Sequence, residues 1–414
     1  MKIEYGCIGE RLKHSFSKEI HNALADYDYR IVEVPREELE SFALEHSFRA
    51  INVTIPYKEM IMPYLYSIDA HAATIGAVNT VVNRDGRLYG YNTDFYGMKS
   101  LLDFAGISLR GKKVVILGTG GTSKTAYAVA GAEGARVILR VSRSGREDAI
   151  TYEELYARHT DAQVIINTTP SGMYPNIFTS AVDISHFPSL DGVIDAVYNP
   201  LRTPLVLSAM KRGIAAMGGL YMLVAQAVRA SEIFTDTSYP SGELERVYRK
   251  ILAEKENIVL IGMPASGKST VARLLKSRLG RTVIDTDELI VRRAGKSIPE
   301  IFAEVGEAGF RELEAEAVRE ASASCGVIIA TGGGAVLRSE NVDALRENGR
   351  LYFIDRPLEA LVPTRDRPTA SDRAAIEQRY AERYDIYCAA ADVRIDATGD
   401  SEAVSKIIEG EFFR

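Results

Sequence analysis

The stretch that most constrains this chain is the motif G-M-P-A-S-G-K-S-T at residues 262–270, which follows the apolar run 258–261. It is typical of a strand running into G-x-x-x-x-G-K-[ST], the phosphate-binding P-loop. The glycines let backbone N–H groups close around phosphate oxygens, and the helix that follows adds positive potential. Lys268 can reach the β- and γ-phosphates of a nucleotide, and the Ser269 hydroxyl can bind Mg²⁺. Because such a loop usually follows the first strand of its domain, we expect the residues before Glu256 to form a separate folding unit.

The composition predicts a globular chain of two or three domains, with 414 residues of which 46% are hydrophobic and 26% charged. The net charge of -6 argues against a protein that coats nucleic acid. Cys7, Cys325 and Cys388 contain no C-x-x-C pair, which favours reduced thiols and no zinc site. No apolar run approaches membrane-spanning length, and the chain enters a strand with no signal-peptide pattern. We therefore expect a cytoplasmic protein with no membrane partner.

Polar candidates lie at the ends of strands in the first hundred residues. Ser15 and Ser17 share a loop, where two hydroxyls can face one polyhydroxylated ligand, although Ser17 also suits the cap of the helix that follows. A hairpin is expected around the turn 83–86, and it leaves Asn79 and Asp94 near strand ends.

Lys58 is the first candidate for proton transfer. It follows a strand that ends in I-P-Y-K, and Pro56 suits the first turn of a helix. Lys58 would then lie near the positive end of a helix dipole, a setting that eases loss of its proton near neutral pH. The same pattern also fits an exposed surface lysine.

A dinucleotide site is predicted at residues 113–122, where a buried strand feeds the glycine turn G-T-G-G-T and a helix. The next strand, 136–141, ends at Ser142 and Arg143. An NAD-binding unit usually has an acidic residue at this place, whereas an arginine accommodates the 2′-phosphate of NADP. The pattern therefore indicates NADP, with a solvated loop arginine as the alternative.

Two further buried strands, 163–167 and 192–195, end in polar and proline residues, where open α/β sheets bind their ligands. A helix from about Gly218 to Phe234 carries Gln226, and a buried glutamine without a partner is costly. Gln226 is therefore expected to face a polar ligand.

These motifs together make the first 250 residues resemble shikimate 5-dehydrogenase. H-S-F-S, N-V-T-I-P-Y-K, G-A-V-N-T, Y-N-T-D, G-T-G-G-T, N-T-T-P-S-G-M, Y-N-P and M-L-V-A-Q-A occur in that order. The resemblance implies that a substrate domain, residues 1–100 completed by 219–248, binds 3-dehydroshikimate. It also implies an NADP-binding Rossmann domain over residues 101–218.

The resemblance assigns roles to residues position by position. Lys58 and Asp94 would be the catalytic pair, giving a proton to the developing alkoxide while NADPH gives hydride to the ketone carbon. The residues that would bind substrate are Ser15, Ser17, Thr54, Asn79, Asp94, Tyr198 and Gln226. Those that would bind the cofactor are Gly118, Thr119, Gly120, Gly121, Thr122, Ser142, Arg143, Gly219 and Met222. Thr119 and Thr122 replace alanines common in the family, and Ser142 replaces the common Asn; we expect these changes to tune cofactor affinity.

The second half carries candidates around the P-loop. Asp285 and Asp287 end a strand opposite it, where carboxylates suit Mg²⁺ and a hydroxyl acceptor, although acidic residues also suit a helix N-terminus. The triple glycine 332–334 would let bare backbone approach a ligand. Arg379 and Arg383 fall on one face of a helix at i,i+4.

This half resembles shikimate kinase, of the nucleoside-monophosphate-kinase-like class, from about residue 257 to 414. The motifs are the P-loop, D-T-D, S-I-P-E-I-F, G-E-x-x-F-R-x-x-E, G-G-G, R-P and R-Y-D-I-Y. The resemblance implies catalytic roles for Lys268, Asp287 and Arg367, with Ser269 and Asp285 at Mg²⁺. The implied shikimate-binding residues are Asp287, Arg311, Gly332, Gly333, Gly334 and Arg383. The implied ATP-binding residues are Gly262, Ala265, Ser266, Gly267, Lys268, Ser269, Thr270 and Arg367. Arg367 belongs to a lid that reads R-P-T-A where the family more often has R-P-L-L, and Arg365 is a second arginine there.

We therefore expect an α/β chain: a substrate domain and a Rossmann domain, a linker at 249–256, and a P-loop kinase with a parallel sheet at 257–414. It would reduce 3-dehydroshikimate with NADPH and phosphorylate shikimate with MgATP, and the sequence leaves a homodimer open. Two alternatives remain. One is an NAD-dependent quinate dehydrogenase, which Arg143 opposes. The other is a nucleotide-binding regulatory protein, opposed by the absence of a basic helix-turn-helix segment and by intact Lys58, Asp94, Lys268, Asp285 and Arg311.

Overall fold

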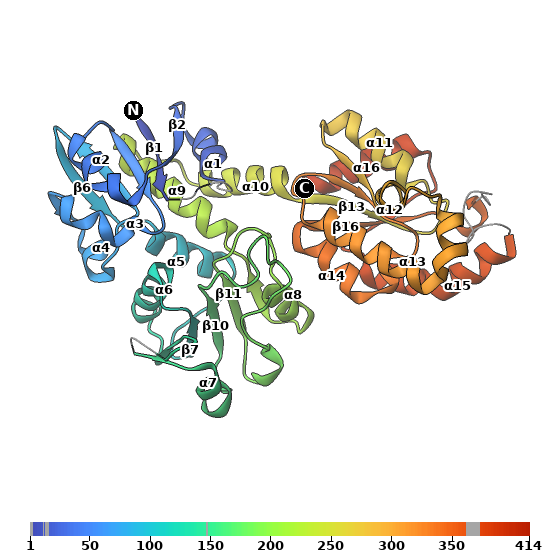
Figure 1. Cartoon of the computed structure of the whole chain (residues 1–414), viewed down its shortest axis with the longest axis horizontal. Coiled ribbons are helices and arrows are strands. Elements are labelled where there is room, and N and C mark those ends of the chain that lie inside the picture. Colours follow the sequence, from blue (N-terminus) through green and yellow to red (C-terminus); the bar gives the residue numbers. More distant parts are fainter. Residues whose placement is uncertain (1–2, 11, 13–15, 146–147, 362–372) are drawn as a thin grey trace. The chain divides into compact units, whose positions relative to one another are not determined.

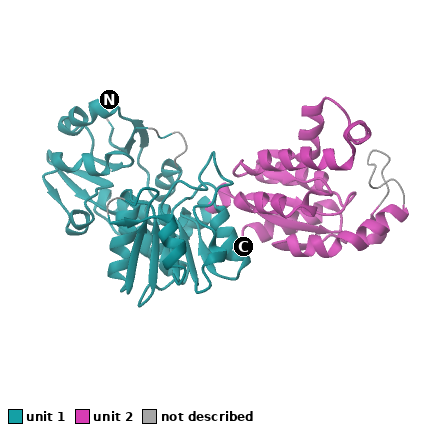
Figure 2. Ribbon diagram, turned by 60° about the horizontal axis from the view of Figure 1, so that its bottom comes forward, with its two compact units in different colours: residues 1–251 teal, residues 252–414 magenta. Residues whose placement is uncertain are grey.

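The computed structural model describes residues 3–10, 12, 16–145, 148–361 and 373–414. The chain divides into two compact units, Met1–Ile251 and Leu252–Arg414 (Figure 2). The boundary falls within helix α10 (Glu243–Lys255), so the segment expected as a linker, 249–256, is helical through Lys255. Over the described residues, no helix is both long enough and apolar enough to cross a membrane.

The first sheet of unit 1 is mixed, in the order β2-β1-β3-β5-β6-β4. Strands β1, β2 and β3 are parallel, whereas β5 runs antiparallel to both β3 and β6. The expected hairpin is confirmed: Asp85 and Gly86 both have positive φ, which matches the twist of the two strands it joins. The strands are β1 (Tyr5–Gly9), β2 (Tyr29–Glu33), β3 (Ala50–Val53), β4 (Ser67–Ile68), β5 (Thr80–Arg84) and β6 (Arg87–Tyr91).

Helices cover this sheet, and one of them comes from much later in the chain. Helix α9 packs against α5 and α1 and touches β3 and β5 (Figure 1). Helix α1 begins at Ser17 itself with Phe16 at the cap position, so Ser17 is not the cap. The helices are α1 (Ser17–Leu24), η1 (Arg36–Glu38), α2 (Leu39–Glu45), α3 (Tyr57–Met60), η2 (Met62–Tyr64), α4 (Ala70–Ile75), α5 (Asp94–Phe104) and α9 (Leu220–Thr235).

The second sheet of unit 1 is entirely parallel, in the order β12-β11-β10-β7-β8-β9. Alternation along β7 sends Val114 and Ile116 to one core and Val115 and Leu117 to the other, so helices cover both faces. The strands are β7 (Lys113–Leu117), β8 (Val137–Val141), β9 (Ala149–Ile150), β10 (Val164–Asn167), β11 (Gly192–Asp195) and β12 (Ala215–Met217). The helices are α6 (Gly121–Ala132), α7 (Tyr152–Arg158), η3 (Ile184–His186) and α8 (Pro204–Lys211).

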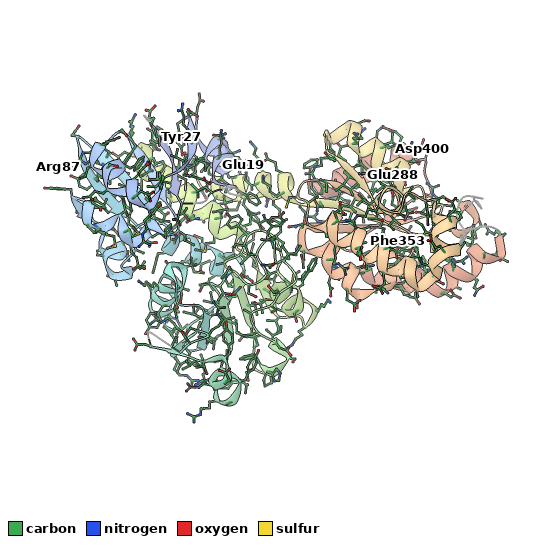
Figure 3. All side chains as sticks on the ribbon, in the orientation of Figure 1. Glu19, Tyr27, Arg87, Glu288, Phe353 and Asp400 are labelled. Atoms are coloured by element: carbon green, nitrogen blue, oxygen red, sulfur yellow. The ribbon has the colours of Figure 1, made fainter. Side chains whose placement is uncertain are left out.

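Unit 2 has a five-stranded parallel sheet in the order β14-β15-β13-β16-β17, with the P-loop strand at its centre. Phe353 in the sheet is buried, whereas Arg87 of unit 1 projects into solvent (Figure 3). The strands are β13 (Asn257–Ile261), β14 (Val283–Asp285), β15 (Ile328–Ala330), β16 (Gly349–Asp355) and β17 (Val393–Asp396). The helices are α11 (Lys268–Leu279), α12 (Thr286–Ala294), α13 (Ile298–Ser322, broken at Gly306), η4 (Ala335–Leu337), α14 (Ser339–Asn348), η5 (Leu358–Ala360), α15 (Arg373–Ala390) and α16 (Ser401–Phe412). The doubly wound parallel sheets confirm the α/β fold class.

Candidate active sites

Lys58 and Asp94 form an ion pair in unit 1. Lys58 lies in α3 and Asp94 begins α5, and the Lys58 Nζ donates to Asp94 Oδ2 at 2.5 Å. Their side chains are 17% and 4% exposed, so Lys58 is not the exposed surface lysine that the sequence left as an alternative. Helix α3 has only four residues, so its dipole is short. The Asp94 carboxylate therefore interacts more strongly with the Lys58 ammonium than the helix dipole does.

Asn79 and Gln226 meet although they are 147 residues apart in the chain. The Asn79 Nδ2 donates to Gln226 Oε1 at 3.2 Å and to Thr93 Oγ1 at 3.0 Å. The Asn79 Oδ1 accepts the Thr93 N–H at 2.8 Å. Thr93 was not predicted as a site residue, although it lies in the quoted Y-N-T-D motif next to Asp94. Helix α9 therefore delivers Gln226 to Asn79, which also bonds to Thr93, the residue before Asp94.

A third amide, Asn52, bonds to this cluster and was also not predicted. Its Nδ2 donates to the Asn79 carbonyl at 3.3 Å and to Thr80 Oγ1 at 3.2 Å. Its Oδ1 accepts the Tyr29 hydroxyl at 2.7 Å. The signal was present in the sequence, because an asparagine inside the apolar strand β3 needs partners.

Two of the remaining substrate candidates, Ser17 and Tyr198, neighbour Phe16. Ser17 is the first residue of α1, and the Tyr198 ring lies 5.2 Å from the Phe16 ring, so both candidates neighbour one aromatic side chain. Burial raises the pKa of Tyr198 to about 12, which keeps its hydroxyl protonated. Thr54 accepts the Tyr57 N–H through its carbonyl at 2.9 Å and so leads into α3. Ser15 lies outside the described residues.

The glycine loop, Gly118 to Thr122, joins β7 to α6 and lies beside the ion pair. A Cβ on Gly121 would stand 3.9 Å from Lys58 Cδ, and Lys124 of α6 pairs with Glu59 of α3 at 2.7 Å. A Cβ on Gly118 would stand 2.8 Å from Thr168 Oγ1, and its φ of 109° also requires glycine. Thr119, Gly120 and Thr122 complete the loop with no more than partial burial.

The strand ends beside this loop provide the other cofactor candidates. Ser142 and Arg143 follow β8, and Leu117 and Val141 are paired at the same edge of the sheet. Arg143 is exposed, whereas the Ser142 Oγ is buried with no hydrogen-bond partner among the described residues. An unsatisfied buried hydroxyl at this edge fits a bound polar ligand.

Two further cofactor candidates open helix α9. Gly219 is tied to the loop after β11, because its N–H donates to the Val197 carbonyl at 2.8 Å. Met222 is buried one turn into α9.

The P-loop of unit 2 folds as the motif predicts. It needs positive φ at Gly262, Ala265 and Gly267, which turn the backbone inward between β13 and α11. Lys268 is buried, and its Nζ donates to the Gly262 and Met263 carbonyls at 2.8 and 2.9 Å. The Ser266 Oγ is buried and has no partner among the described residues, which suits a phosphate oxygen.

Asp285 caps a helix and also accepts a hydrogen bond from the P-loop side chain Ser269. Its Oδ1 accepts the N–H groups of Asp287 and Glu288 and so caps α12. Its Oδ2 accepts the Ser269 hydroxyl at 2.8 Å. A hydroxyl and a carboxylate oxygen at one point are ligands that Mg²⁺ accepts. The neighbouring Thr270 is exposed.

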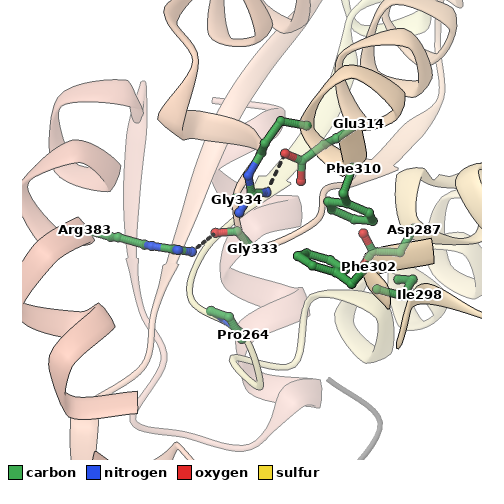
Figure 4. A pocket seen from close by; sticks show the side chains of 10 residues that line it. Pro264, Asp287, Ile298, Phe302, Phe310, Glu314, Gly333, Gly334 and Arg383 are labelled. Atoms are coloured by element: carbon green, nitrogen blue, oxygen red, sulfur yellow. Dashed lines mark hydrogen bonds and ion pairs between the residues drawn. The ribbon is translucent and has the colours of Figure 1, made fainter. Parts of the chain in front are cut away.

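Figure 4 shows a pocket in unit 2 that is lined by most of the residues predicted to bind the substrate of the kinase. Phe302 and Phe310 stack at 4.4 Å beside Asp287. Five of the lining residues were not predicted as site residues, although all five lie within motifs quoted above: Pro264, Ile298, Phe302, Phe310 and Glu314. The lining residues are Pro264, Asp287, Ile298, Phe302, Phe310, Arg311, Glu314, Gly333, Gly334 and Arg383.

Arg311 is held in this pocket by two carboxylates. Its Nη1 donates to Glu314 Oε2 at 2.7 Å and its Nη2 to Glu307 Oε1 at 3.1 Å. Glu314 is 1% exposed; burial raises its pKa, and the charge of Arg311 opposes that rise. The pairing fixes one guanidinium orientation at the pocket wall.

The structure shows why residues 332–334 are all glycine, which the sequence did not reveal. A Cβ on Gly332 would stand 2.6 Å from Asp287 Oδ1, and one on Gly333 would stand 2.7 Å from Pro264 Cγ. A Cβ on Gly334 would collide with the Arg311 guanidinium. The glycines therefore make room for the chain's own side chains.

Arg383 points into the same region, because its Nη1 donates to the Gly333 carbonyl at 3.2 Å. The Tyr387 hydroxyl donates to the same oxygen. Arg379 bonds instead within its own helix, to the Ala375 carbonyl, so of the expected arginine pair only Arg383 lines the pocket. Arg365 and Arg367 lie outside the described residues.

The two units therefore define two classes of site. A glycine loop of a doubly wound sheet beside a Lys–Asp pair is typical of a dinucleotide-dependent oxidoreductase. A P-loop beside an acceptor pocket with acidic and basic groups is typical of a small-molecule kinase.

Comparison with known proteins supplies the family. Residues 7–81 match the shikimate dehydrogenase substrate binding domain, and residues 264–410 match shikimate kinase. Shikimate dehydrogenase (NADP(+)) of Clostridium perfringens is 36% identical over 270 residues, covering 61% of this chain and 98% of that protein. The chain belongs to the shikimate dehydrogenase family, with a shikimate kinase domain in its second half.

Solved structures agree with this assignment. Shikimate dehydrogenase 1 of Peptoclostridium difficile is 37% identical with a TM-score of 0.56, covering 61% of this chain and 98% of that one. A chorismate mutase/shikimate 5-dehydrogenase fusion protein of Clostridium acetobutylicum is 33% identical with a TM-score of 0.56, covering 60% and 97%. Shikimate 5-dehydrogenase of Thermus thermophilus, in complex with NADP(H) and shikimate, is 26% identical with a TM-score of 0.55, covering 60% and 99%.

Proposed function

We propose that this chain is a bifunctional enzyme that reduces 3-dehydroshikimate to shikimate with NADPH and then phosphorylates shikimate with MgATP. The observation that carries the proposal is that one chain matches two families whose reactions share shikimate as product and substrate. The reactions belong to aromatic amino acid biosynthesis.

In the reduction, NADPH held by the glycine loop and the strand-end residues would supply a hydride for the ketone carbon. Lys58, whose Nζ is held by Asp94 at 2.5 Å, gives a proton to the ketone oxygen as it becomes an alkoxide. The C=O bond thus becomes a C–O–H group, and Asp94 keeps the ammonium of Lys58 oriented for the transfer.

The substrate is oriented by amides and hydroxyls around this pair. Asn79 donates to Gln226 Oε1 at 3.2 Å, so two of the assigned side chains meet at one place. We assign the hydroxyl and carboxylate contacts of the substrate to six residues: Ser15, Ser17, Thr54, Asn79, Tyr198 and Gln226.

NADP is the cofactor we propose over NAD, because Arg143 offers a positive charge at the end of β8, where an acidic residue would favour NAD. The relatives matched over this region are named for NADP(+). The glycine loop, Ser142, Gly219 and Met222 complete the cofactor contacts in this assignment. A quinate dehydrogenase that uses NAD remains the alternative, and oxidation rates of shikimate and quinate with each cofactor distinguish the two.

In the kinase, Asp287 would accept the proton of the shikimate hydroxyl that attacks the γ-phosphate of ATP. Lys268 and the P-loop backbone would hold the phosphates, and Ser269 and Asp285 would hold Mg²⁺. Arg311, Arg383 and the glycines 332–334 would bind the carboxylate end of shikimate. Arg367 is assigned to the lid over the transferring phosphoryl group.

We assign the domains in the same way: residues 1–100 with 219–248 bind substrate, 101–218 bind NADP, 249–256 link the halves, and 257–414 form the kinase. The packing of α9 on α5 and α1 supports the return of residues 219–248 to the first domain. The cysteines are free thiols, which supports a cytoplasmic enzyme. The small-molecule substrates are the proposed partners, with no nucleic acid or membrane, and sedimentation would test a homodimer.

A coupled assay tests the proposal. The purified chain receives 3-dehydroshikimate, NADPH and MgATP, and loss of NADPH and formation of ADP are followed together. We expect both signals in the wild type. Lys58→Ala should remove reduction while leaving phosphorylation of added shikimate, and Lys268→Ala should do the reverse. If the wild type gives neither signal, the bifunctional proposal is wrong; if it gives only NADPH loss, the kinase half is inactive.

A further inference from the structure

Two buried polar side chains face each other where strands β10 and β11 end. Asn167 and Asp195 are register partners on these parallel strands, and both are fully buried. The Asn167 Nδ2 donates to Asp195 Oδ1 at 3.0 Å. Neither residue belongs to the substrate or cofactor contacts assigned above.

Asp195 holds the loop that carries Tyr198. Its Oδ1 also accepts the Val197 N–H at 3.0 Å, and its Oδ2 accepts the Thr203 hydroxyl at 2.7 Å. Thr203 in turn caps α8 by accepting the Val206 N–H. Both ends of the segment 196–203 are therefore fastened to one carboxylate.

Asn167 extends the same network to the glycine loop. Its Oδ1 accepts the N–H and the hydroxyl of Thr169 at 3.0 and 2.7 Å. Thr168 and Thr169 pack directly on Gly118, where an added Cβ would stand 2.8 and 3.2 Å from their side chains. The Thr168 hydroxyl also donates to the Leu117 carbonyl at 2.6 Å, at the start of the loop.

The loop after β11 also positions the start of α9. The Val197 carbonyl accepts the Gly219 N–H at 2.8 Å, and the Ala196 carbonyl leaves no room for a Cβ on Gly219. Helix α9 then carries Gln226 to Asn79. One buried carboxylate thus connects the glycine loop, the Tyr198 loop and the helix that delivers Gln226.

A carboxylate is suited to this junction because an ionised carboxylate only accepts hydrogen bonds, and all three groups around it donate. The groups that face it are the Asn167 amide, the Val197 N–H and the Thr203 hydroxyl, and none of the three is charged. Burial raises the pKa of Asp195 to about 6, so its charge is costly to keep. A side chain retained at such a cost, at the junction of two binding loops, indicates a positioning role.

We propose that Asp195 is a positioning residue of the dehydrogenase, which sets the cofactor loop and the substrate loop in register through Asn167 and Val197. The inference rests on the proposed function of unit 1. It assigns Asp195 no contact with either ligand, so its effect must reach both binding steps together.

Asp195→Asn tests the inference, because the amide keeps the shape but turns a donor toward groups that also donate. We expect the KM values for NADPH and for 3-dehydroshikimate each to rise about tenfold, while the kinase rate of the same chain is unchanged. Asp183→Asn is the matched control: Asp183 is an exposed carboxylate that caps η3 in the same domain. Both KM values should stay unchanged there.

Direct binding of NADP⁺, followed by calorimetry, separates this inference from the proposed reaction. Weaker binding in Asp195→Asn supports the positioning role even if the wild type fails to reduce 3-dehydroshikimate. If unit 1 of Asp195→Asn shows no unfolding transition, the variant has not folded and Thr203→Ala replaces it as the test. Thr203→Ala removes only one donor and should give a smaller rise in the same two KM values. Unchanged KM values and NADP⁺ affinity in a folded variant, with only a lower Tm, would overturn the inference.

Discussion

The two sites on this chain are built from different parts of the polypeptide. In unit 1 the walls are side-chain amides and hydroxyls that bond to one another, as Asn79, Thr93 and Gln226 do. In unit 2 the walls combine apolar rings with bare backbone and an ion pair, as Phe302, Gly334 and the Arg311–Glu314 pair show. The first site is thus assembled by long-range packing of helices, and the second by leaving out side chains where charged groups must fit.

The difference predicts different weaknesses. A site made of mutually bonded amides fails when one amide is removed, because its partners are left buried and unsatisfied. A site made of close-packed glycines fails when a single methyl group is added, because the arginine beside it must move. Each unit also serves as the internal control for changes in the other.

Gly334→Ala should have the largest effect. The added Cβ would displace the Arg311 guanidinium, and a misplacement of about 1 Å costs about 100-fold in activity. We expect the kinase kcat/KM for shikimate to fall by about that factor while NADPH oxidation is unchanged. Gly410→Ala is the control, since no atom lies near its Cβ position in α16. Equal kinase activity in both variants would show that Arg311 does not set shikimate affinity.

Asn79→Ala is the matching change in unit 1. It leaves the Thr93 N–H without its acceptor and Gln226 without its donor, so we expect kcat/KM for 3-dehydroshikimate to fall about 30-fold with the kinase intact. Asn83→Ala is the control, because Asn83 makes three hydrogen bonds to backbone groups near the same strand and none to the site. A similar loss in both variants would mean that Asn79 acts through stability alone.

Arg143→Ala sharpens the comparison of the two nucleotide loops. We assign phosphate in the kinase loop to several backbone N–H groups and Lys268, whereas we assign the 2′-phosphate of NADP to one exposed side chain, Arg143. The KM for NADPH should rise about tenfold, since one charge-assisted hydrogen bond is lost, and the KM for NADH should not change. Arg158→Ala, an exposed arginine on α7, provides the control. A proportional rise for both cofactors would remove Arg143 from 2′-phosphate recognition.

The smallest expected effect is a difference between the two units in how their stability depends on pH. Burial, with a contribution from Asp343, raises the pKa of Glu347 in unit 2 to about 8, so the folded state keeps a proton that the unfolded state releases above its ordinary value of 4.5. The stability this proton contributes is complete below about pH 4.5 and is lost as the pH rises through about 8.

Between about pH 7 and 8 the Tm of unit 2 should therefore fall by about 2–4 °C. Burial lowers the pKa of His21 in unit 1 to about 3 and raises that of Asp195 to about 6, so neither group changes its proton binding appreciably in that window. Calorimetry on Glu347→Gln should show a unit 2 Tm that depends less on pH in this window. Glu340→Gln, which changes an exposed carboxylate, is the control. A slope that persists in Glu347→Gln would assign it to another group.

Much of the local architecture could be predicted from the sequence. The P-loop, the glycine turn after β7 and the hairpin at Asp85–Gly86 each depend on residues within a few positions of one another. Site residues next to such motifs, such as Lys268 and Asp285, were predicted for the same reason. Thr93 and Asn52 were not, because their importance comes from partners that the sequence does not place beside them. Glu314 was also missed, although its partner Arg311 lies three residues before it in the same quoted motif.

The sequence by itself determined where phosphate-binding turns form, which strands are buried on both faces, and which two families the halves resemble, since these follow from local spacing and backbone preference. Only the tertiary structure decided that Lys58 is paired rather than exposed, that Gln226 reaches Asn79 across 147 residues, and that Gly334 must be bare because Arg311 fills its place. The physical reason is that desolvation and close packing act between groups brought together by folding, whatever their separation along the chain.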